Sequence, residues 1–292
     1  MKPHLLTLSV VTLAVLAFSA CSSDESAPTF VIAGIPDQDV SVLEVRFGNL
    51  AEYLSKETGL GVQYVPVADY STVVTAFKQG DIQMAWYGGL TGVQARLAVP
   101  DAVAVAQRPR DAEFHSVFVA TLGSGITSLA DLNGKSFTFG SESSTSGHLM
   151  PRFYLTEAGV DPEGDFSALS FSGSHDVTWK LVEQGAFDAG ALNEAVWEAR
   201  VAAGEVDLDK VDVFFRTPAY FDYHWVVNSD VDKTYGTGTV AKVRETLLAI
   251  STASGGQAAE IAEAFQTDRF VATKNANYDA IEGIARSLGI VD

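Results

Sequence analysis

The sequence predicts an α/β protein with two similar lobes, and three observations support this prediction. Strand-type and helix-type patterns alternate along the whole chain, as is typical of helices packed on mainly parallel sheets. About 265 residues follow the polar stretch 22–28, which suits one large domain or two lobes of ordinary size. The stretch 69–85 is echoed at a constant offset by 174–190, each reading as loop, helix, glycine stop and strand. Two related lobes would produce this echo, and so would chance similarity between two βαβ units.

The first 20 residues have the pattern of a secretory signal peptide. Lys2 precedes an apolar run at 5–17, which is too short to span a membrane, and the small residues Ser19 and Ala20 follow. Cys21 comes next and is the only cysteine, so the fold has no internal disulfide. This order resembles a bacterial lipoprotein signal, in which the cysteine becomes the first mature residue and carries the lipid. The alternative is an ordinary secreted protein with an incidental cysteine. Residues 21–28 are accordingly interpreted as a lipidated cysteine and a polar tether.

After the tether, glycines separate apolar runs of alternating type. Apolar residues at helical spacing fill 42–56 and stop at Gly59, and a second helical pattern opens at 69–71 and stops at Gly80. A glycine-containing loop at 87–89 precedes a third helical run. Together these patterns predict strands at 30–35, 62–67 and 82–86 and helices at 42–56, 70–79 and 90–97.

The rest of the chain continues the alternation and contains two β runs that we expect to cross between the lobes. The first crossing is expected at 117–122 and the second at 223–227. The other patterns predict strands at 136–139, 187–191 and 211–216 and helices at 128–132, 175–182, 194–202, 240–250, 258–265 and 278–288.

The composition excludes several classes of function. Hydrophobic residues make up 47% of the chain and allow a substantial core, and no second apolar run is long enough for a membrane helix. The formal net charge of −18 argues against nucleic-acid binding, because a phosphate backbone requires a basic surface. His115, His148, His175 and His224 lack the close spacing of a metal site. We therefore expect neither a metal nor a cofactor.

The stretch 138–151 predicts an anion-binding loop. A β-prone run ends at Phe139, a glycine and several hydroxyl residues follow, and a helical pattern then begins. This order leaves unpaired backbone N–H groups at the positive end of a helix dipole, so an anion can bind without Lys or Arg. Ser144, Thr145 and Ser146 can add hydroxyl donors at the same point. The alternative is an ordinary run of turn and N-cap residues.

Further motifs occur in a fixed order around this loop: Asp69-Tyr70, Ala85-Trp86-Tyr87-Gly88, Ser144-Thr145-Ser146-Gly147, Gly173-Ser174-His175, Asn193-Glu194 and Pro218-Ala219-Tyr220-Phe221-Asp222. With these motifs, the chain after residue 28 resembles the substrate-binding proteins of phosphonate and phosphite ABC importers. Segments 35–39, 138–147 and 222–225 look closest to the branch labelled selenate-binding. The resemblance implies the type II periplasmic-binding-protein clamshell, in which two crossing strands join two α/β lobes around a ligand cleft. We expect 29–118 with 226–292 to form lobe I and 119–225 to form lobe II.

The resemblance also implies a ligand site and no catalytic residues. It places two tyrosines on the lobe I wall, three hydroxyl residues in an oxyanion cradle, a histidine donor on the neighbouring helix, and an acidic pair that completes the pocket of amine-bearing phosphonate binders. In that order, the residues are Tyr70, Tyr87, Ser144, Thr145, Ser146, His175, Glu194 and Asp222. The residue types agree with these roles, because a phenol or a helix-start histidine can donate to an anion without a permanent charge. The alternatives are a packing aromatic for Tyr70 and a surface or cap residue for His175.

Asp222 restricts the type of oxyanion. A carboxylate repels a tetrahedral anion unless the ligand brings a proton or an ammonium group to share with it. Monoprotonated phosphonate, phosphite and selenite carry an O–H, whereas selenate and sulfate are fully ionised at neutral pH. If Asp222 lines the pocket, a protonatable oxyanion is favoured over selenate, against the branch label. An Asp222 side chain turned toward Tyr223 or Arg216 would remove this argument.

Charged and aromatic residues near the motifs are expected to have structural roles. We expect Arg108, Arg152 and Arg216 to form surface or lobe-stabilising ion pairs in so acidic a chain. Trp86 and Trp225 adjoin the motifs and are expected to pack in the core or hinge.

We expect a binding protein, and two other classes remain as alternatives. The chain has no Gly-x-Ser-x-Gly elbow, His-Glu-x-x-His helix, Walker loop or dinucleotide fingerprint. A hydrolase would use Ser144, His175 and Asp222, with the nucleophile and its base at hydrogen-bond distance. A ligand-presenting partner of a membrane sensor kinase would bind the same anion as an importer does.

The resemblance implies partners and a location. The ligand is a small oxyanion, and the protein partners are an ABC permease and its ATPase. We expect a monomer in the periplasm, held at the bacterial membrane by a lipid on Cys21. Closure of the lobes on the anion would precede docking on the permease.

Overall fold

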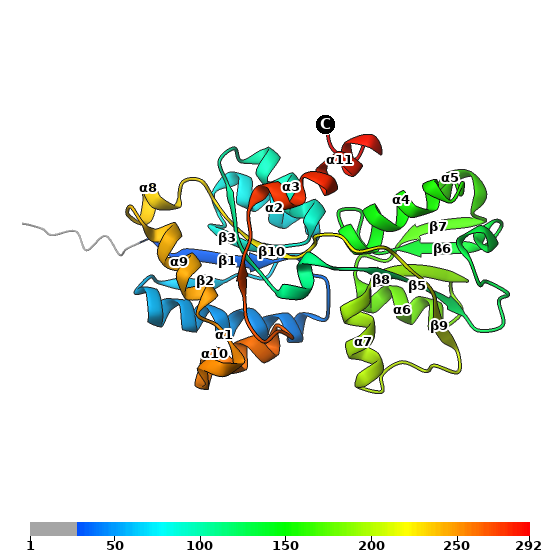
Figure 1. The fold of residues 1–292 in the computed structure, drawn as a ribbon, viewed down its shortest axis with the longest axis horizontal. Helices are drawn as coiled ribbons and strands as arrows, with labels where there is room; N and C mark the ends of the chain where they lie inside the picture. Colours follow the sequence, from blue (N-terminus) through cyan, green and yellow to red (C-terminus); the bar gives the residue numbers. More distant parts are fainter. Residues whose placement is uncertain (1–27) are drawn as a thin grey trace, which may run out of the picture.

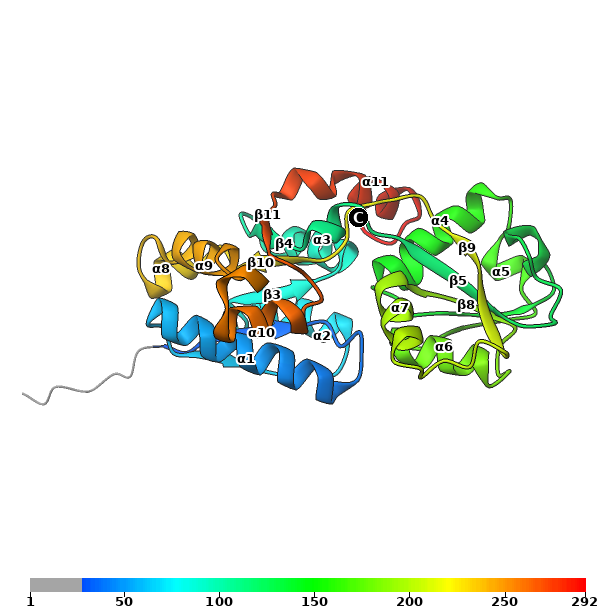
Figure 2. The ribbon, with the colours of Figure 1, turned by 60° about the horizontal axis from the view of Figure 1, so that its bottom comes forward.

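The computed structural model describes residues 28–292. The expected signal peptide, the lipid site at Cys21 and most of the tether lie outside the described residues. Between residues 28 and 292, none of the helices combines the length and the apolar character that a membrane crossing requires. Figures 1 and 2 show two bodies side by side, each with its own sheet, connected by extended segments.

The first body contains a six-stranded sheet with helices on both faces. Its strand order is β11 (Val271–Ala272), β4 (Val103–Gln107), β10 (His224–Val227), β3 (Met84–Tyr87), β1 (Phe30–Gly34) and β2 (Val62–Tyr64). One face carries α1 (Val40–Thr58), α9 (Thr239–Leu248) and α10 (Gly256–Ala264). The other face carries α2 (Tyr70–Gln79), α3 (Gly89–Ala98) and α11 (Asp279–Ser287), and the short α8 (Val231–Tyr235) precedes α9 (Figure 1).

The second body contains a five-stranded sheet. Its strand order is β7 (Ala168–Phe171), β6 (Ser136–Phe139), β8 (Ala189–Asn193), β5 (Ser116–Thr121) and β9 (Val211–Arg216). The helices are α4 (Met150–Glu157), which continues a π-helical turn at Thr145–Leu149, α5 (Pro162–Asp165), α6 (His175–Glu183) and α7 (Glu194–Ala202). Separate apolar clusters fill the two sides of this sheet, one around Phe137 and one around Trp179.

The two sheets share one topology. The order β2-β1-β3-β10-β4 in the first corresponds to β7-β6-β8-β5-β9 in the second. The echoed segments of the sequence fall on equivalent units, β2–α2–β3 and β7–α6–β8. Asp69 and Ser174 each cap a helix start through the side chain, and Gly80 and Gly185 end those helices with φ of 80° and 72°. The internal echo therefore falls on equivalent positions of two lobes with the same strand order.

Strand directions follow from how the chain enters each lobe. The first three strands of each sheet are parallel: β1 with β2 and β3, and β6 with β7 and β8. Strands β10 and β5 enter from the other lobe, so they run against strands that end at the boundary. The expectation of mainly parallel sheets was therefore wrong for the entering strands, and both sheets are mixed.

The chain crosses between the lobes at 108–115 and 217–223, where Phe114 and Tyr220 form an antiparallel bridge. Both crossings were expected a few residues too late. The run 117–122 lies mainly in β5 and pairs inside the second sheet, and 223–227 lies mainly in β10 and pairs inside the first. The long apolar runs form buried sheet strands, whereas the crossing segments carry polar residues such as Arg108 and Asp222.

The other predicted elements are confirmed, with shifts of up to three residues at their ends, whereas β4, β7, β11, α5 and α8 were not predicted. Trp86 and Trp225 pack in the core of the first lobe, as expected, with 2% and 0% of their surface exposed. The two-lobed α/β fold predicted from the sequence is confirmed.

Candidate functional site

Helix N-termini gather at the boundary between the lobes. Strands β1, β3, β6 and β8 end there, so the helices that follow them begin there. The backbone N–H of Leu90 in α3 donates to Thr145 Oγ1 at 2.9 Å, and that of His175 in α6 donates to Asp37 O at 3.2 Å. The N–H of Asp39, just before α1, donates to Asp176 Oδ2 at 3.1 Å. Because these bonds join the two lobes, the structure is a closed arrangement with several positive helix ends around one region.

The predicted anion loop lies at this boundary. Ser144, Thr145 and Ser146 are all buried, and Ser144 Oγ accepts the N–H of Gly147 at 2.9 Å as the N-cap of the helical run. A Cβ on Gly147 would lie 3.1 Å from Gly140 Cα and 3.2 Å from His175 Cε1, so the loop and the start of α6 are in close contact. The two turns that the sequence reasoning joined are therefore neighbours. The N–H groups of Thr145 and Ser146 open the helical run, where no intrahelical acceptor exists for them.

His175 lies in this group as a neutral ring. Burial lowers its pKa, although Asp37 and Asp176 act in the opposite direction. Its Nδ1 faces the backbone N–H of Asn193 at 3.4 Å and therefore accepts, which leaves the proton on Nε2. Nε2 lies 3.4 Å from Tyr223 Oη, so this N–H points into the interlobe region.

Tyr70 contributes the phenol at the start of α2. Its surface is 2% exposed, and no residue between 28 and 292 provides a hydrogen-bond partner for its Oη. Burial raises its pKa well above the ordinary value, the carboxylates of Asp37 and Asp222 add to this rise, and the nearby hydroxyl of Ser144 acts in the opposite direction. Since the phenol stays protonated, it is an unused donor beside the loop.

Asp222 lies at the centre of the group. Its Oδ1 accepts the N–H of Gly89 at 2.8 Å, while its buried Oδ2 has no partner within the described part of the chain. Burial raises the pKa of this carboxyl to about 7, against the effect of hydrogen bonds from Gly89 and Thr145. A Cβ on Gly88 would lie 3.0 Å from Thr145 Oγ1 and 3.1 Å from Asp222 Oδ1, so a larger residue here would crowd both oxygens. The Asp222 side chain does not pair with Tyr223 or Arg216. The condition under which Asp222 would favour a protonatable oxyanion is therefore not removed.

Four residues of the site were not predicted: Asp37, Asn193, Tyr220 and Tyr223. The phenol of Tyr223 donates to Asp37 Oδ2 at 2.7 Å and accepts from Asn193 Nδ2 at 3.0 Å, which links both lobes to the crossing segment. Tyr220 bonds Ser116 Oγ at 2.7 Å. The signal was present in the sequence, because Tyr220 and Tyr223 lie on either side of Asp222 and because Asp37 lies three residues after the end of β1.

Two predicted site residues are not brought to this group. Tyr87 ends β3, but its phenol points into the lobe I core, where it donates to Val73 O at 3.3 Å and its ring packs against Phe77. The Glu194 carboxylate pairs with Arg216. Alternation along β3 explains the first difference, because Trp86 and Tyr87 must face opposite sides of the sheet.

The three arginines form ion pairs, as expected. Arg108 is buried and pairs with Asp111 at 2.6 Å under the rings of Trp86 and Tyr223. Arg152 pairs with Glu163 at 2.7 Å, and Arg216 pairs with Glu194. Of the three, Arg108 also acts on the interlobe group, because its guanidinium lies 5.2 Å from the ring centre of Tyr223 and its charge acts to lower the pKa of Asp222.

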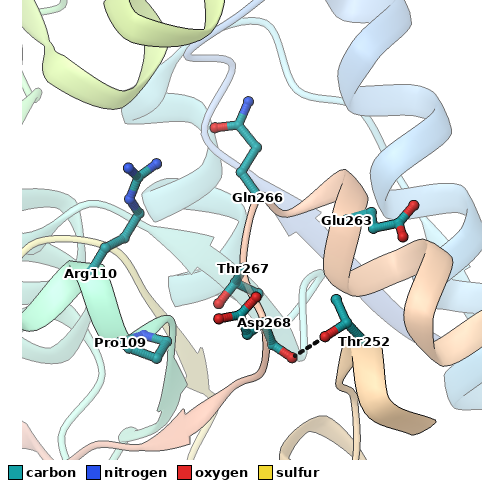
Figure 3. A pocket seen from close by; sticks show the side chains of 7 residues that line it. All are labelled: Pro109, Arg110, Thr252, Glu263, Gln266, Thr267 and Asp268. Atoms are coloured by element: carbon teal, nitrogen blue, oxygen red, sulfur yellow. Dashed lines mark hydrogen bonds between the residues drawn. The ribbon is translucent and has the colours of Figure 1, made fainter. Parts of the chain in front are cut away.

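Several pockets on the described residues are open to solvent, and two of them involve a crossing segment or the lobe boundary. Figure 3 shows one of about 450 Å³ between the first crossing segment and the chain that leads from α10 to β11. Its lining mixes Arg110 with Glu263 and Asp268, and it contains none of the predicted site residues. A smaller pocket of about 250 Å³ adjoins Tyr70 and the anion loop.

Known proteins share this architecture. Residues 32–278 match the family described as the periplasmic substrate-binding protein of the phosphonate ABC transporter. The chain is 39% identical over 282 residues to PhnD1 of Prochlorococcus marinus (strain MIT 9301), named as a phosphite-binding protein of an ABC transporter, covering 94% of this chain and 95% of PhnD1. A solved structure of PhnD1 in complex with methylphosphonate has a TM-score of 0.87 and covers 90% of this chain and 99% of its own.

A more distant relative agrees with this placement. The phosphate-import protein PhnD of Mycolicibacterium smegmatis is 30% identical over 224 residues, which is 70% of each chain. The family match spans most of the chain and both lobes. The chain therefore belongs to the periplasmic substrate-binding proteins of phosphonate ABC transporters.

Proposed function

We propose that the chain captures a small, protonatable phosphorus oxyanion such as phosphite or methylphosphonate between its closed lobes. The observation that carries this proposal is the pair of buried oxygens Tyr70 Oη and Asp222 Oδ2, which have no partner among residues 28–292. A monoprotonated oxyanion satisfies both, since one oxygen accepts from the phenol and its O–H donates to the carboxylate. The relative PhnD1, named for phosphite and solved with methylphosphonate, supports this choice of ligand.

The backbone resolves the conflict between an anionic ligand and a net charge of −18. The overall charge repels anions at long range. At the site, the N–H groups of Thr145 and Ser146 and the Nε2–H of His175 supply a local positive field. No Lys or Arg is required in this arrangement.

Closure couples binding to transport in this proposal. Tyr70 belongs to lobe I, the loop and His175 belong to lobe II, and Asp222 lies on a crossing segment. A ligand that touches all three parts binds the closed state better than the open one and shifts the equilibrium toward it. For the lobes we propose limits close to the expected 29–118 with 226–292 and 119–225, but with both boundaries a few residues earlier, because β5 pairs in the lobe II sheet and β10 pairs in the lobe I sheet.

We further propose that the site binds and does not hydrolyse. Ser144 Oγ accepts from Gly147 N–H, and the ring of His175 faces Asn193 and Tyr223. Within residues 28–292, no hydrogen bond joins Ser144 to His175 or His175 to Asp222, so a nucleophile with its base is not formed. A ligand-presenting role for a sensor kinase would use the same site, and membership of a transporter family favours import.

The proposal extends to the location and the excluded ligands. We propose a lipid anchor at Cys21 and a monomer that delivers its ligand to the permease. Replacing Cys21 with alanine should release the protein from the membrane fraction, and mass spectrometry should detect the lipid on the wild-type cysteine.

Selenate lacks a proton to share with Asp222, so we propose that the site rejects selenate, although the sequence resembles the branch labelled selenate-binding.

Isothermal titration of the purified chain tests the ligand assignment. The panel is phosphite, methylphosphonate, phosphate, selenite, selenate and sulfate, each at two pH values. We expect phosphite or methylphosphonate to bind at least about 100-fold tighter than selenate and sulfate. Equal or tighter binding of the fully ionised anions would overturn the proposal.

A further inference from the structure

We propose that His224 is a positioning residue that fixes the backbone of Asp222 and thereby maintains the preference for a protonatable oxyanion. Gly92 provides the space for its ring. This inference rests on the proposed function, because it concerns how the carboxylate that shares the ligand's proton is held. His224 begins β10, directly after the second crossing segment, and lies two residues beyond Asp222.

Asp222 is held at three points, and His224 supplies one of them. The Asp222 N–H donates to Asp111 O on the first crossing segment at 2.9 Å, and its Oδ1 accepts from Gly89 N–H at 2.8 Å. The third point is the Asp222 carbonyl oxygen, which lies 3.0 Å from His224 Nδ1. Because a carbonyl oxygen can only accept, Nδ1 carries the proton of this ring. The His224 bond therefore completes the restraint on the backbone from which the carboxylate projects.

The surroundings of His224 keep its ring neutral and in one orientation. Burial lowers its pKa well below the ordinary value, and the charge of Arg96 acts in the same direction, against the bond to the Asp222 carbonyl. The ring is fully buried and stacks on Tyr278 with 3.7 Å between the ring centres. Its Nε2 has no hydrogen-bond partner among residues 28–292, so Nδ1 makes the bond that anchors the ring. A phenylalanine would stack on Tyr278 without burying an unpaired nitrogen, so the stacking by itself does not account for a histidine.

Helix α3 connects this ring to the carboxylate. Its first residue is Gly89, whose N–H bonds Asp222, and Gly92 lies about one turn later. A Cβ at Gly92 would collide with Cε1 and Nε2 of His224, and this glycine is buried. The helix packs against α11, which follows Tyr278 (Figures 1 and 2). A substitution at Gly92 should therefore displace the His224 ring without altering its chemistry.

The titration of Asp222 reports the position of its carboxylate. Burial raises the pKa of this group to about 7. A carboxylate that moves toward solvent should have a pKa closer to the ordinary value, so the shared proton should be lost at a lower pH. Burial also raises the pKa of each nearby tyrosine, so none of them titrates below pH 9. These tyrosines and the other charged groups around Asp222 and His224 are Tyr70, Tyr220, Tyr223, Tyr278, Arg96 and the ion pair of Arg108 with Asp111.

The experiment titrates phosphite and sulfate into variants of the full secreted chain from pH 5 to 9. His224→Phe keeps the stacking and removes the donor, whereas His224→Asn keeps an N–H near the place of Nδ1. We expect His224→Phe to bind phosphite at least about fivefold more weakly, and His224→Asn to stay within about twofold of the wild type. Gly92→Ala displaces the ring and should resemble His224→Phe. In both, the decline of phosphite affinity should begin about one pH unit lower, and the preference for phosphite over sulfate should decrease.

His115→Phe is the matched control. The Nδ1 of His115 bonds Thr217 O at 2.7 Å, so this variant removes the same kind of bond at the opposite end of the second crossing segment. We expect its phosphite affinity and pH dependence to match those of the wild type within about twofold. Losses equal to those of His224→Phe would indicate a general loss of hinge rigidity and would overturn the inference.

Nuclear magnetic resonance of the ¹⁵N-labelled wild type tests the inference even if a variant does not fold. The ring nitrogen shifts of His224 should show a neutral ring with its proton on Nδ1 from pH 5 to 9. The signal of that proton should move when phosphite binds, because the bond joins the ring to Asp222. A proton on Nε2, or a signal that phosphite leaves unchanged, would overturn the inference.

The outcomes separate this inference from the proposed function. If the wild type binds phosphite but His224→Phe and His224→Asn lose equal affinity, ring packing accounts for the loss and the positioning role is refuted. Wild-type affinity and pH dependence in His224→Phe would refute it as well, and in both cases the proposed function stands. Failure of the wild type to bind phosphite or methylphosphonate would refute the proposed function first.

Discussion

Burial raises the pKa of the Asp222 carboxyl to about 7, from an ordinary value of 3.8. In the proposed complex, this group and a phosphorus oxyanion would share one proton near neutral pH, and either partner could be its donor. Because the pKa of Asp222 is higher in the folded protein than in the unfolded chain, the folded state binds one more proton at this residue between about pH 4 and pH 7. The associated stabilisation is complete below about pH 4 and is lost as the pH rises through about 7.

This residue yields a prediction about pH and selectivity. In the wild type, affinity for phosphite should fall as the pH rises above about 7, approaching about tenfold per pH unit once the shared proton is lost. Asp222→Asn offers an amide donor that does not titrate, so the decline should flatten and binding of sulfate and selenate should increase. Titrations from pH 5 to 9 measure both effects. An unchanged slope in the variant would show that Asp222 does not hold the proton.

At the scale of elements, the proposed site uses helix N-termini where other anion sites use cationic side chains. The loop after β6 leads into the π-helical turn at Thr145–Leu149, and α6 begins beside it with His175. Both helices present peptide dipoles whose positive ends meet at the boundary. The hydroxyl groups of the loop add to this field, and the backbone should carry the larger share.

A pair of substitutions at Ser146 separates the two contributions. Ser146→Ala removes one hydroxyl and should weaken phosphite binding by about 2- to 10-fold, the usual worth of a neutral hydrogen bond. Ser146→Pro removes the backbone N–H in the first helical turn, where proline is tolerated, and should weaken binding by about 10- to 100-fold. Titration measures both affinities, and thermal unfolding shows whether the helix is retained. Equal losses for the two variants would contradict a backbone-based site.

At the scale of the whole molecule, the closed arrangement depends on contacts outside the ligand group. The Asp176 carboxylate in α6 accepts the N–H of Asp39 at 3.1 Å and bonds from Arg200 at 2.8 and 2.7 Å. Burial opposes its ionisation, but the Arg200 hydrogen bonds prevail and lower its pKa. A carboxylate of lobe II thus sits at the N-terminus of α1 in lobe I, where a negative charge is favourable.

Asp176→Asn should therefore favour opening. We expect the ligand to dissociate about tenfold faster while the association rate changes little, because the contact forms only after closure. Stopped-flow fluorescence measures the rates, and small-angle X-ray scattering measures the population of open molecules. Asp207→Asn is the matched control, since its pair with Lys210 is exposed to solvent and lies within lobe II. Similar effects in both variants would exclude a specific latch at Asp176.

The sequence supported the main part of the site because several motifs coincide with helix starts. Strand–loop–helix order located the 144–146 loop and His175, and the structure brings them together with Tyr70 and Asp222. The sequence also placed Tyr87 in the cleft. Its backbone lies at the end of β3, near the boundary, but its side chain faces the core of lobe I. The prediction also failed for Glu194, which pairs with Arg216 across 22 residues of sequence. Alternation along β3 requires only that Trp86 and Tyr87 face opposite sides of the sheet, and the pairing of Glu194 with Arg216 depends on contact between two elements, so neither direction follows from the local sequence alone.

What the sequence determined by itself is local: the alternation of strands and helices, the capped helix starts and the internal echo between 69–85 and 174–190. These features depend on residues a few positions apart, so periodicity and capping chemistry suffice to reveal them. Only the tertiary structure decided the mixed strand directions, the true crossings at 108–115 and 217–223, and the meeting of Tyr70 with Asp222. These features depend on how two lobes close on each other, which brings together groups more than 100 residues apart and gives Asp222 its raised pKa through burial.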